Sequence, residues 1–209
     1  MNTFSIKEAV SFGWDAFKKD PWFYAGITLA LTAISFIINM LTNGSGPIAI
    51  VGFLISLAAS TFITIAYGRL ALSVNGGTHA AWKDLWAPER FWNMLGTTIL
   101  QGVIILIGLV LLIIPGIVAC LMLSMAQLSV VDKNLNPIEA IKESYRLTKG
   151  HLLQLLLLVL LVAVMNIVGA VLLLVGLLVS IPVSLIAIAH VYKKLNAMES
   201  VTVVAAPTS

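Results

Sequence analysis

The sequence predicts an all-α polytopic membrane protein with six transmembrane helices arranged as three hairpins. The 209-residue chain is 60% hydrophobic and only 10% charged, whereas soluble domains carry about 25% charged residues. Its Lys, Arg, Asp and Glu residues leave three uncharged stretches, 21–68, 91–131 and 152–192. Each stretch is about twice the length that a helix needs to cross a bilayer. The alternative, a water-soluble helical fold, would have to bury an unusually large apolar surface.

Turn-forming residues divide each uncharged stretch into two predicted helices. Residues 42–47 have the sequence TNGSGP and mark the first turn, Pro115-Gly116 marks the second, and Gly176 marks the third. The six predicted helices cover residues 22–42, 47–68, 92–114, 116–131, 152–175 and 177–192. Pro182 is expected to kink the sixth helix, because proline removes a backbone donor from the helix interior.

The distribution of positive charge predicts that both termini are cytoplasmic. None of the three hairpin tips carries Lys or Arg, and the segments outside the hairpins hold all twelve of these residues. By the positive-inside rule, those segments face the cytoplasm. No cleavable signal peptide is apparent, so the first apolar stretch is expected to remain as a membrane helix.

An amphipathic helix is expected at the membrane interface before each hairpin. Ser5 with Glu8, and Asn136 with Glu139, match the capping-box pattern at the start of the first and third of these helices. Pro137 suits the first position of the third helix. The predicted apolar faces are Ile6, Val10, Trp14 and Phe17 in the first helix, and Ile138, Ile141, Tyr145 and Thr148 in the third.

Equal residue spacing indicates three related units. A Glu-Ala pair, an aromatic residue five positions after the Ala and a Lys four positions later occur in 8–18 and again in 139–149, while 81–90 matches less well. The predicted units are residues 5–75, 77–133 and 136–195, within a single membrane domain of residues 1–195 that a flexible tail at 196–209 follows. The alternative is that any basic interfacial helix placed before a hairpin has this appearance.

Basic residues beside the predicted spans are candidates for contacts with lipid headgroups or with the membrane interface. They are Lys18, Lys19, Arg69, Arg90, Lys142, Arg146 and Lys149. Anionic headgroups attract such side chains near the membrane surface. Arg69 directly follows the second span, and two interpretations remain open. Its side chain snorkels to the interface, or it pairs with Asp132 or with a lipid phosphate.

Four uncharged polar residues inside the spans are candidates for intramembrane contacts: Asn39, Gln101, Gln127 and Asn166. Such residues form hydrogen bonds between membrane helices. They also mark substrate pathways, because polar groups are costly in the membrane. The predicted spans hold no buried carboxylate, which disfavours proton-coupled transport.

The sequence contains no catalytic or metal-binding motif. His79, His151 and His190 lie in different segments without metal-ligand spacing, and Cys120 is the single cysteine. The basic residues flank apolar spans and do not form a stripe, which argues against nucleic-acid binding. The sequence therefore predicts that the protein is not an enzyme and uses no cofactor.

The stretch between residues 114 and 155 resembles a known group of membrane proteins. Its motif comprises Ile114-Pro115-Gly116-Ile117, Val131-Asp132, Glu139-Ala140, Ser144 and Leu147-Thr148-Lys149-Gly150. It resembles the YciC-like bacterial inner-membrane proteins and the membrane domain associated with glycerophosphoryl diester phosphodiesterases, and the six-span layout is similar over most of the chain. The resemblance implies a multi-pass protein of the bacterial cytoplasmic (inner) membrane. The chain contains no soluble phosphodiesterase domain, so that activity is not expected.

The residues of this motif also have structural interpretations. Pro115 and Gly116 form a turn, and Asp132 ends the fourth span. Ser144 is small enough to allow close packing of the third amphipathic helix. Gly150 follows a helix end, where glycine tolerates the left-handed C-cap conformation.

Three functions remain open from the sequence. The first is a non-enzymatic protein that binds, organises or moves lipids or other amphipathic molecules, with the phospholipid bilayer and its anionic lipids as partner. The second is a scaffold or accessory subunit that docks a membrane-protein partner or a second copy of itself. The third is a small-solute transporter lined by Asn39, Gln101 and Asn166.

Overall fold

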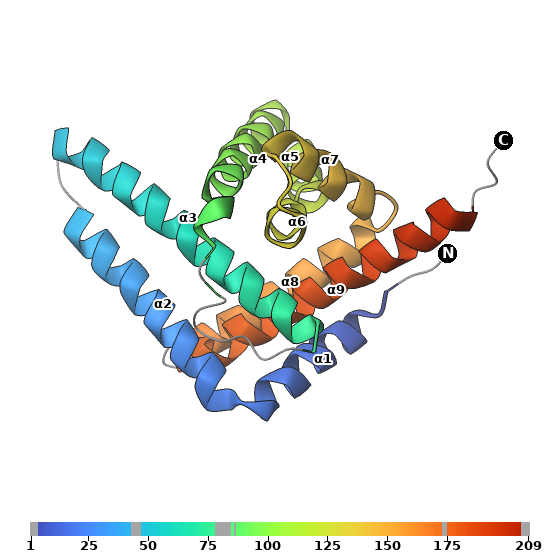
Figure 1. The fold of residues 1–209 in the computed structure, drawn as a ribbon, viewed down its shortest axis with the longest axis horizontal. Coiled ribbons are helices and arrows are strands. Elements are labelled where there is room, and N and C mark those ends of the chain that lie inside the picture. The colour runs from blue at the N-terminus through green and yellow to red at the C-terminus, as the bar shows by residue number, and fades with distance from the viewer. Residues whose placement is uncertain (1–3, 43–46, 78–84, 86, 173–174, 206–209) are drawn as a thin grey trace.

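The computed structural model describes residues 4–42, 47–77, 85, 87–172 and 175–205, and these ranges contain helices and no strand. Figure 1 shows the arrangement of the helices. In chain order they are α1 (Ile6–Lys19), α2 (Pro21–Thr42), α3 (Pro47–Asn75), η2 (Pro88–Arg90), α4 (Phe91–Leu111), α5 (Ile113–Met122), α6 (Ala126–Lys133), α7 (Pro137–Thr148), α8 (Leu152–Val171) and α9 (Leu177–Ala205). The tip of the first predicted turn, and most of the middle amphipathic segment, lie outside the described residues.

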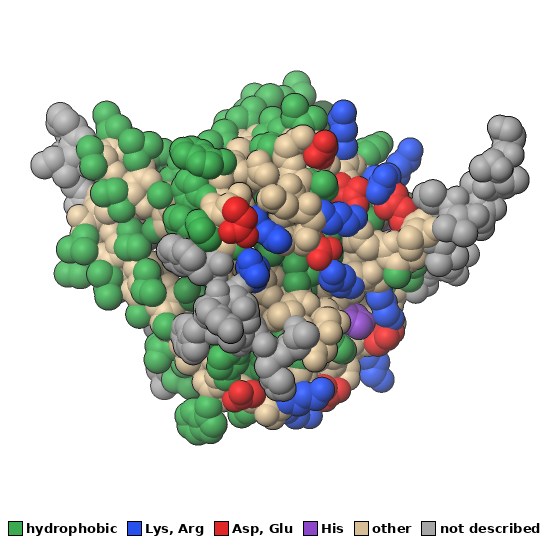
Figure 2. Space-filling view, in the orientation of Figure 1, with side chains coloured by type: hydrophobic (Ala, Val, Ile, Leu, Met, Phe, Trp, Pro, Cys, Tyr) green, Lys and Arg blue, Asp and Glu red, His purple; other side chains and the backbone are tan. Residues whose placement is uncertain are grey.

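Six helical segments are long enough and apolar enough to cross a membrane, which confirms the predicted number of spans. They are Pro21–Thr42, Ala49–Asn75, Pro88–Leu111, Ile113–Lys133, Leu152–Val171 and Leu177–Ser200. Large apolar side chains cover their outer faces, and Leu41 and Val110 are each 79% exposed. Figure 2 shows such side chains concentrated over α2, α3 and α4, whereas charged side chains gather over the centre, the right and the lower edge of the view.

The second turn lies earlier in the chain than predicted. α4 ends at Leu111, Leu112 is extended, and α5 begins at Ile113. Pro115 and Gly116 therefore lie inside the first turn of α5 and not at the tip. Proline fits there because the first N–H groups of a helix have no acceptor within the helix. Gly116 allows close approach to α4, since a Cβ on it would lie 2.4 Å from Leu109 Cδ2.

The fourth span is broken into two helices, where the sequence predicted one helix over 116–131. α5 ends at Met122 and α6 begins at Ala126, with a short non-α segment between them. Proline and glycine are absent from residues 123–125, so no sequence signal marks the break. The groups that compensate for this break come from α7 and α4.

The helix α9 lies at the centre of the structure and packs against α1, α2, α3, α7 and α8. Its inward side chains, among them Ile186, Val191 and Tyr192, are fully buried. α9 also continues to Ala205, ten residues into the segment 196–209 that the sequence predicted as a flexible tail. The extension is stabilised by contacts of Asn196 with α6 and of Glu199 with α7.

The buried faces of α1 and α7 overlap only in part with the apolar faces that the sequence predicted, since Phe17 and Thr148 are buried and Ile6 and Val10 pack on the core. α1 buries Ala9, Gly13, Ala16 and Phe17, whereas Trp14 is 45% exposed. The face of α7 that packs on the protein consists of Ala140, Glu143, Ser144, Leu147 and Thr148, whereas Ile138 and Tyr145 are exposed. Small side chains are favoured at these helix contacts because they let two helix backbones approach closely.

The spans form three consecutive pairs, and the segment before each pair packs against the second span of another pair. α1 lies on α9, and α7 lies on α6. Leu85 and Ala87, from the segment before α4, belong to buried clusters with Ile65 and Ala66 of α3. This cyclic pattern is consistent with three related units, although the repeat itself stays a prediction.

We expect Gly13→Ala to destabilise the protein, because a Cβ there would lie 2.5 Å from the backbone oxygen of Val183. Overpacking of this kind costs about 1–3 kcal/mol. Gly26→Ala is the matched control, since nothing lies within 4 Å of that Cβ position in α2. Thermal unfolding in detergent should give a lower midpoint for Gly13→Ala alone. Equal midpoints for the two variants would mean that α1 does not need this close approach.

Candidate functional site

α7 docks against the break in the fourth span through two hydroxyl groups. Ser144 Oγ donates to Met122 O at 2.8 Å and accepts from Met125 N–H at 3.1 Å. Thr148 Oγ1 donates to the same Met122 oxygen at 3.0 Å. Both hydroxyl-bearing residues are fully buried. Ser144 is therefore a hydrogen-bonding residue as well as the small packing residue that the sequence predicted.

Gln101 and Asn166 make hydrogen bonds between segments. Gln101 Nε2 of α4 donates to Leu123 O at 3.2 Å, inside the same break. Asn166 Oδ1 of α8 accepts from Ser180 Oγ at 2.8 Å, and Asn166 Nδ2 lies 3.4 Å from Ser184 Oγ. Both residues have the interhelical role that is typical of polar side chains in membrane helices.

Asn39 and Gln127 have different surroundings. Asn39 is exposed, and its side chain donates to Ser35 O within α2. Gln127 lines a cavity of about 320 Å³ between α3, α4, α6 and α9, together with the polar side chains of Thr64 and Tyr67. In the part of the chain that the structure describes, no hydrogen bond joins any two of the four predicted intramembrane polar residues, so they do not form one site.

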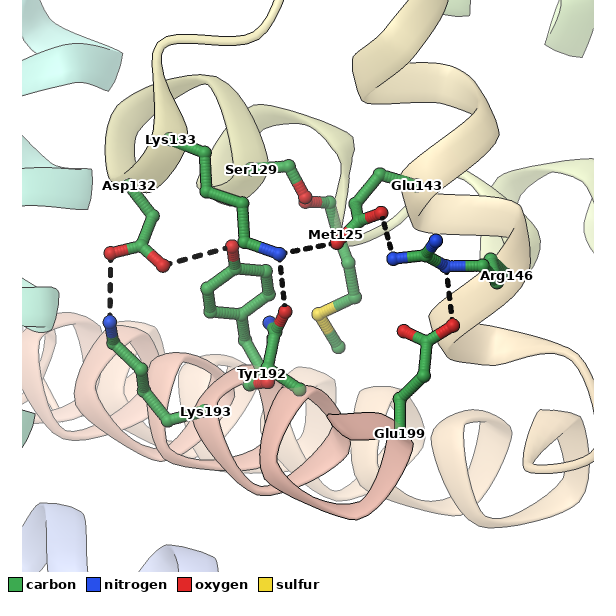
Figure 3. A network of polar contacts seen from close by, with 10 residues as sticks. Met125, Ser129, Asp132, Lys133, Glu143, Arg146, Tyr192, Lys193 and Glu199 are labelled. Atoms are coloured by element: carbon green, nitrogen blue, oxygen red, sulfur yellow. Dashed lines mark hydrogen bonds and ion pairs between the residues drawn. The ribbon is translucent and has the colours of Figure 1, made fainter. Parts of the chain in front are cut away.

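Glu143 is the centre of a charged network that joins α6, α7 and α9 (Figure 3). Its carboxylate is 10% exposed and accepts from Lys133 Nζ at 2.5 Å and from Arg146 Nη2 at 2.6 Å. Lys133 also donates to Asn196 Oδ1 at 2.7 Å, and Arg146 pairs with Glu199. A carboxylate so deeply placed requires such partners. Arg146, a predicted headgroup contact, is therefore engaged within the protein.

Asp132 lies near the end of α6 and pairs with α9. Its Oδ1 accepts from Lys193 Nζ at 2.8 Å, and its Oδ2 accepts from the Tyr192 hydroxyl at 3.1 Å (Figure 3). Arg69 does not pair with Asp132, so that alternative from the sequence is wrong. Its carboxylate neighbour is Glu89, whose Oε1 lies 3.8 Å from Arg69 Nη1.

Three cations surround one pocket, which we call the basic pocket. Arg69 comes from α3, Arg90 from η2 and Lys193 from α9, and the pocket has a volume of about 270 Å³. It is also lined by Leu72, Ser73, Leu85, Val131 and Asp132. Of the described residues in this lining, Asp132 is the single carboxylate, and Glu89 is 57% exposed beside it. The pocket therefore has the charge and the donors to bind an anion.

The structure brings together two of the predicted headgroup residues, Arg69 and Arg90, and adds a third cation that the sequence reasoning missed. In the sequence, Lys193 lies beside Lys194, directly after the uncharged stretch that ends at residue 192. This position at the end of an apolar stretch was the signal that could have added Lys193 to the candidate headgroup contacts, because such contacts are expected at span ends. Only the fold places Lys193 opposite Arg69.

The remaining predicted headgroup cations lie on the exposed surfaces of α1 and α7. Lys18 Nζ lies 5.3 Å from the ring centroid of Trp14, and Lys149 Nζ lies 5.9 Å from that of Tyr145. Lys19 and Lys142 are exposed as well. Gly150 follows α7 with a φ of +95°, the left-handed conformation expected of a glycine C-cap.

A second charged cluster joins α1 to α9 and changes one of the predicted caps. Lys194 Nζ donates to Glu8 Oε1 at 2.5 Å and lowers the pKa of the Glu8 carboxyl. Ser5 Oγ accepts from Glu8 N–H at 3.3 Å, but the Glu8 side chain points to α9 and does not close the capping box. At the start of α7 the box between Asn136 and Glu139 is complete.

Within the described ranges, no group of three His, Cys, Asp or Glu side chains could hold a metal ion. Cys120 is an exposed free thiol on α5. The absence of enzymatic activity and of a cofactor stays a prediction.

We expect Ser144→Ala to lower stability by about 1–3 kcal/mol, because it leaves Met122 O with one donor fewer and Met125 N–H without its acceptor. Ser11→Ala is the control, since Ser11 is exposed on α1. Both variants remove one hydroxyl from a serine in a helix. If the thermal midpoint of Ser144→Ala equals that of Ser11→Ala, the hydrogen bonds of Ser144 to the break do not stabilise the fold.

Comparison with known proteins identifies a family without assigning an activity. No curated protein and no solved structure matches the chain. One family model matches residues 22–208, which cover nearly all of the described helices except α1. The resemblance to the YciC-like proteins and to the phosphodiesterase-associated domain stays a prediction. The chain belongs to the family described as a domain of unknown function, DUF7847.

Proposed function

We propose that the protein is a non-enzymatic, multi-pass membrane protein that binds the headgroups of anionic phospholipids at the cytoplasmic face. The observation that carries this proposal is the basic pocket, in which Arg69, Arg90 and Lys193 converge beside the ends of three candidate spans. Guanidinium groups bind phosphate oxygens through charged hydrogen bonds, often two at a time. A lipid phosphate at the membrane surface has the matching charge.

The proposed topology consists of three transmembrane hairpins with both termini in the cytoplasm of a bacterial cell, at the inner membrane. It is supported by the positions of Lys and Arg outside the three hairpin tips. α1 and α7 are then amphipathic helices at the interface. Trp14 and Tyr145, each 45% exposed with a lysine near its ring, suit the headgroup layer.

The other two functions have less support. A solute path lined by Asn39, Gln101 and Asn166 is disfavoured, because the side-chain NH2 group of each already donates to a backbone oxygen and the three acceptors lie in different segments. A scaffold role has no specific contact surface in its favour. Lipid binding alone accounts for a pocket of cations with incomplete ion pairing.

We expect the double variant Arg69→Gln/Arg90→Gln to retain anionic lipid poorly. Protein purified in mild detergent and exchanged into phosphatidylglycerol-containing micelles should carry bound lipid, which native mass spectrometry counts directly. The double variant should bind roughly thirtyfold more weakly, since about 1 kcal/mol per basic residue, about 2 kcal/mol in all, is lost. Lys142→Gln/Lys149→Gln removes the same charge from an exposed surface outside the basic pocket and should weaken lipid binding far less. If both double variants lose lipid equally, net charge and not the pocket holds the lipid.

We expect the hairpin tips and the polar ends of the helices to lie on opposite sides of the membrane. In a Cys120→Ser background, Leu41→Cys or Ile113→Cys should react with a membrane-impermeant maleimide added to intact cells. Glu199→Cys should react only after the cells are opened. Labelling of Glu199→Cys in intact cells would reverse the proposed orientation.

A further inference from the structure

An apolar groove lies between α2 and α3, directly beside the basic pocket. It has a volume of about 370 Å³, and its lining consists of Leu31, Ile34, Ala59, Phe62, Ile63, Ala66 and Leu85. Leu85 lines the basic pocket as well, so the two spaces meet at its side chain. None of these seven described residues is charged or carries a polar side chain.

The groove and the basic pocket lie along one face of α3. Ala59, Phe62, Ala66 and Arg69 are spaced by three or four residues, the spacing of neighbours on one side of a helix. Phe62 and Ala66 line the groove, and Arg69 comes one turn later and lines the pocket. A ligand that occupied both spaces would therefore be extended parallel to α3, with its anionic end at Arg69.

Among the residues that the structure describes, the arginines at the end of this face have incomplete ion pairs. Glu89 Oε1 is 3.8 Å from Arg69 Nη1 and 3.6 Å from Arg90 Nε, distances too long for hydrogen bonds. Arg90 Nε is buried and donates no hydrogen bond to any described residue. A buried donor without an acceptor is unfavourable. Two guanidinium groups that share one distant carboxylate are arranged to accept a further anion between them.

The length of the groove matches a lipid of a single leaflet. Ten residues separate Ala59 from Arg69, which corresponds to about 15 Å along a helix. This is half of the roughly 30 Å thickness of the hydrocarbon core. We propose that the basic pocket and the groove together form one seat for a phospholipid of the cytoplasmic leaflet, with its phosphate at Arg69 and Arg90 and one acyl chain between α2 and α3. This inference rests on the proposed function and adds the acyl-chain site to it.

The test places a large side chain in the groove and leaves the three cations of the basic pocket unchanged. Ile34 is 47% exposed at the rim, and Ile34→Trp and Ala59→Trp both place an indole in the space for the chain. Ala33→Trp is the control, because Ala33 is exposed on α2 and does not line the groove. The purified full-length protein is titrated with phosphatidylglycerol in detergent, and native mass spectrometry counts the bound lipid. The groove variants should bind it on the order of tenfold more weakly, whereas Ala33→Trp should bind like the wild type.

Soluble glycerol 3-phosphate, which has the phosphate and no acyl chain, should not displace the lipid at concentrations that saturate a phosphate site. Displacement would show that the pocket holds a free phosphate ester and would overturn the acyl-chain site. Wild-type binding by both groove variants, with loss in Arg69→Gln/Arg90→Gln, would also overturn it and leave the proposed function intact. If the arginine variant binds like the wild type, both proposals fail. The thermal midpoint of each variant shows whether it is folded. If Ala59→Trp does not fold, Ile34→Trp alone tests the acyl-chain site.

Discussion

Backbone polar groups that lie away from water must find partners within the chain, and this constraint governs how the helices are assembled. A continuous helix satisfies its own groups, but the fourth span is interrupted after Met122. Ser144 and Thr148 of α7 and Gln101 of α4 supply the missing partners. α7 is therefore held at one defined depth and rotation against the break. Its hydroxyl-bearing face is buried together with Leu147, and Ile138 and Tyr145 remain exposed.

The position of α7 in turn determines the charged layer. With Ser144 at the break, Glu143 on the neighbouring position of the helix points between α6 and α9, where Lys133 and Arg146 neutralise it. The end of α9 is long enough to reach this network through Asn196 and Glu199. One helix thus serves both as a buried span and as the support of the polar layer. Ion pairs of partly exposed residues add little stability by themselves, so their main effect is to align the three helices.

Charge is neutralised unevenly across this layer. Glu143 has two cations within hydrogen-bond distance, and Asp132 has Lys193 and the Tyr192 hydroxyl. Among the described carboxylates, Arg69 and Arg90 share the distant Glu89 alone. Close and complete pairs are typical of structural contacts, whereas incompletely paired guanidinium groups beside a pocket are typical of anion recognition. This contrast distinguishes the candidate lipid site from the rest of the charged surface.

The sequence by itself determined the all-helical class and the six apolar helices, because these depend on composition and on local spacing. The tertiary structure decided which faces of α1 and α7 are buried, since close backbone approach favours Gly13 and Ser144 over Trp14 and Tyr145. It also decided the break before Ala126 and the helical state of residues 196–205, which no local breaker or capping signal marks. Arg69, Arg90 and Lys193 are far apart in the chain. Their convergence depends on the packing of α3, η2 and α9, which local sequence patterns do not encode.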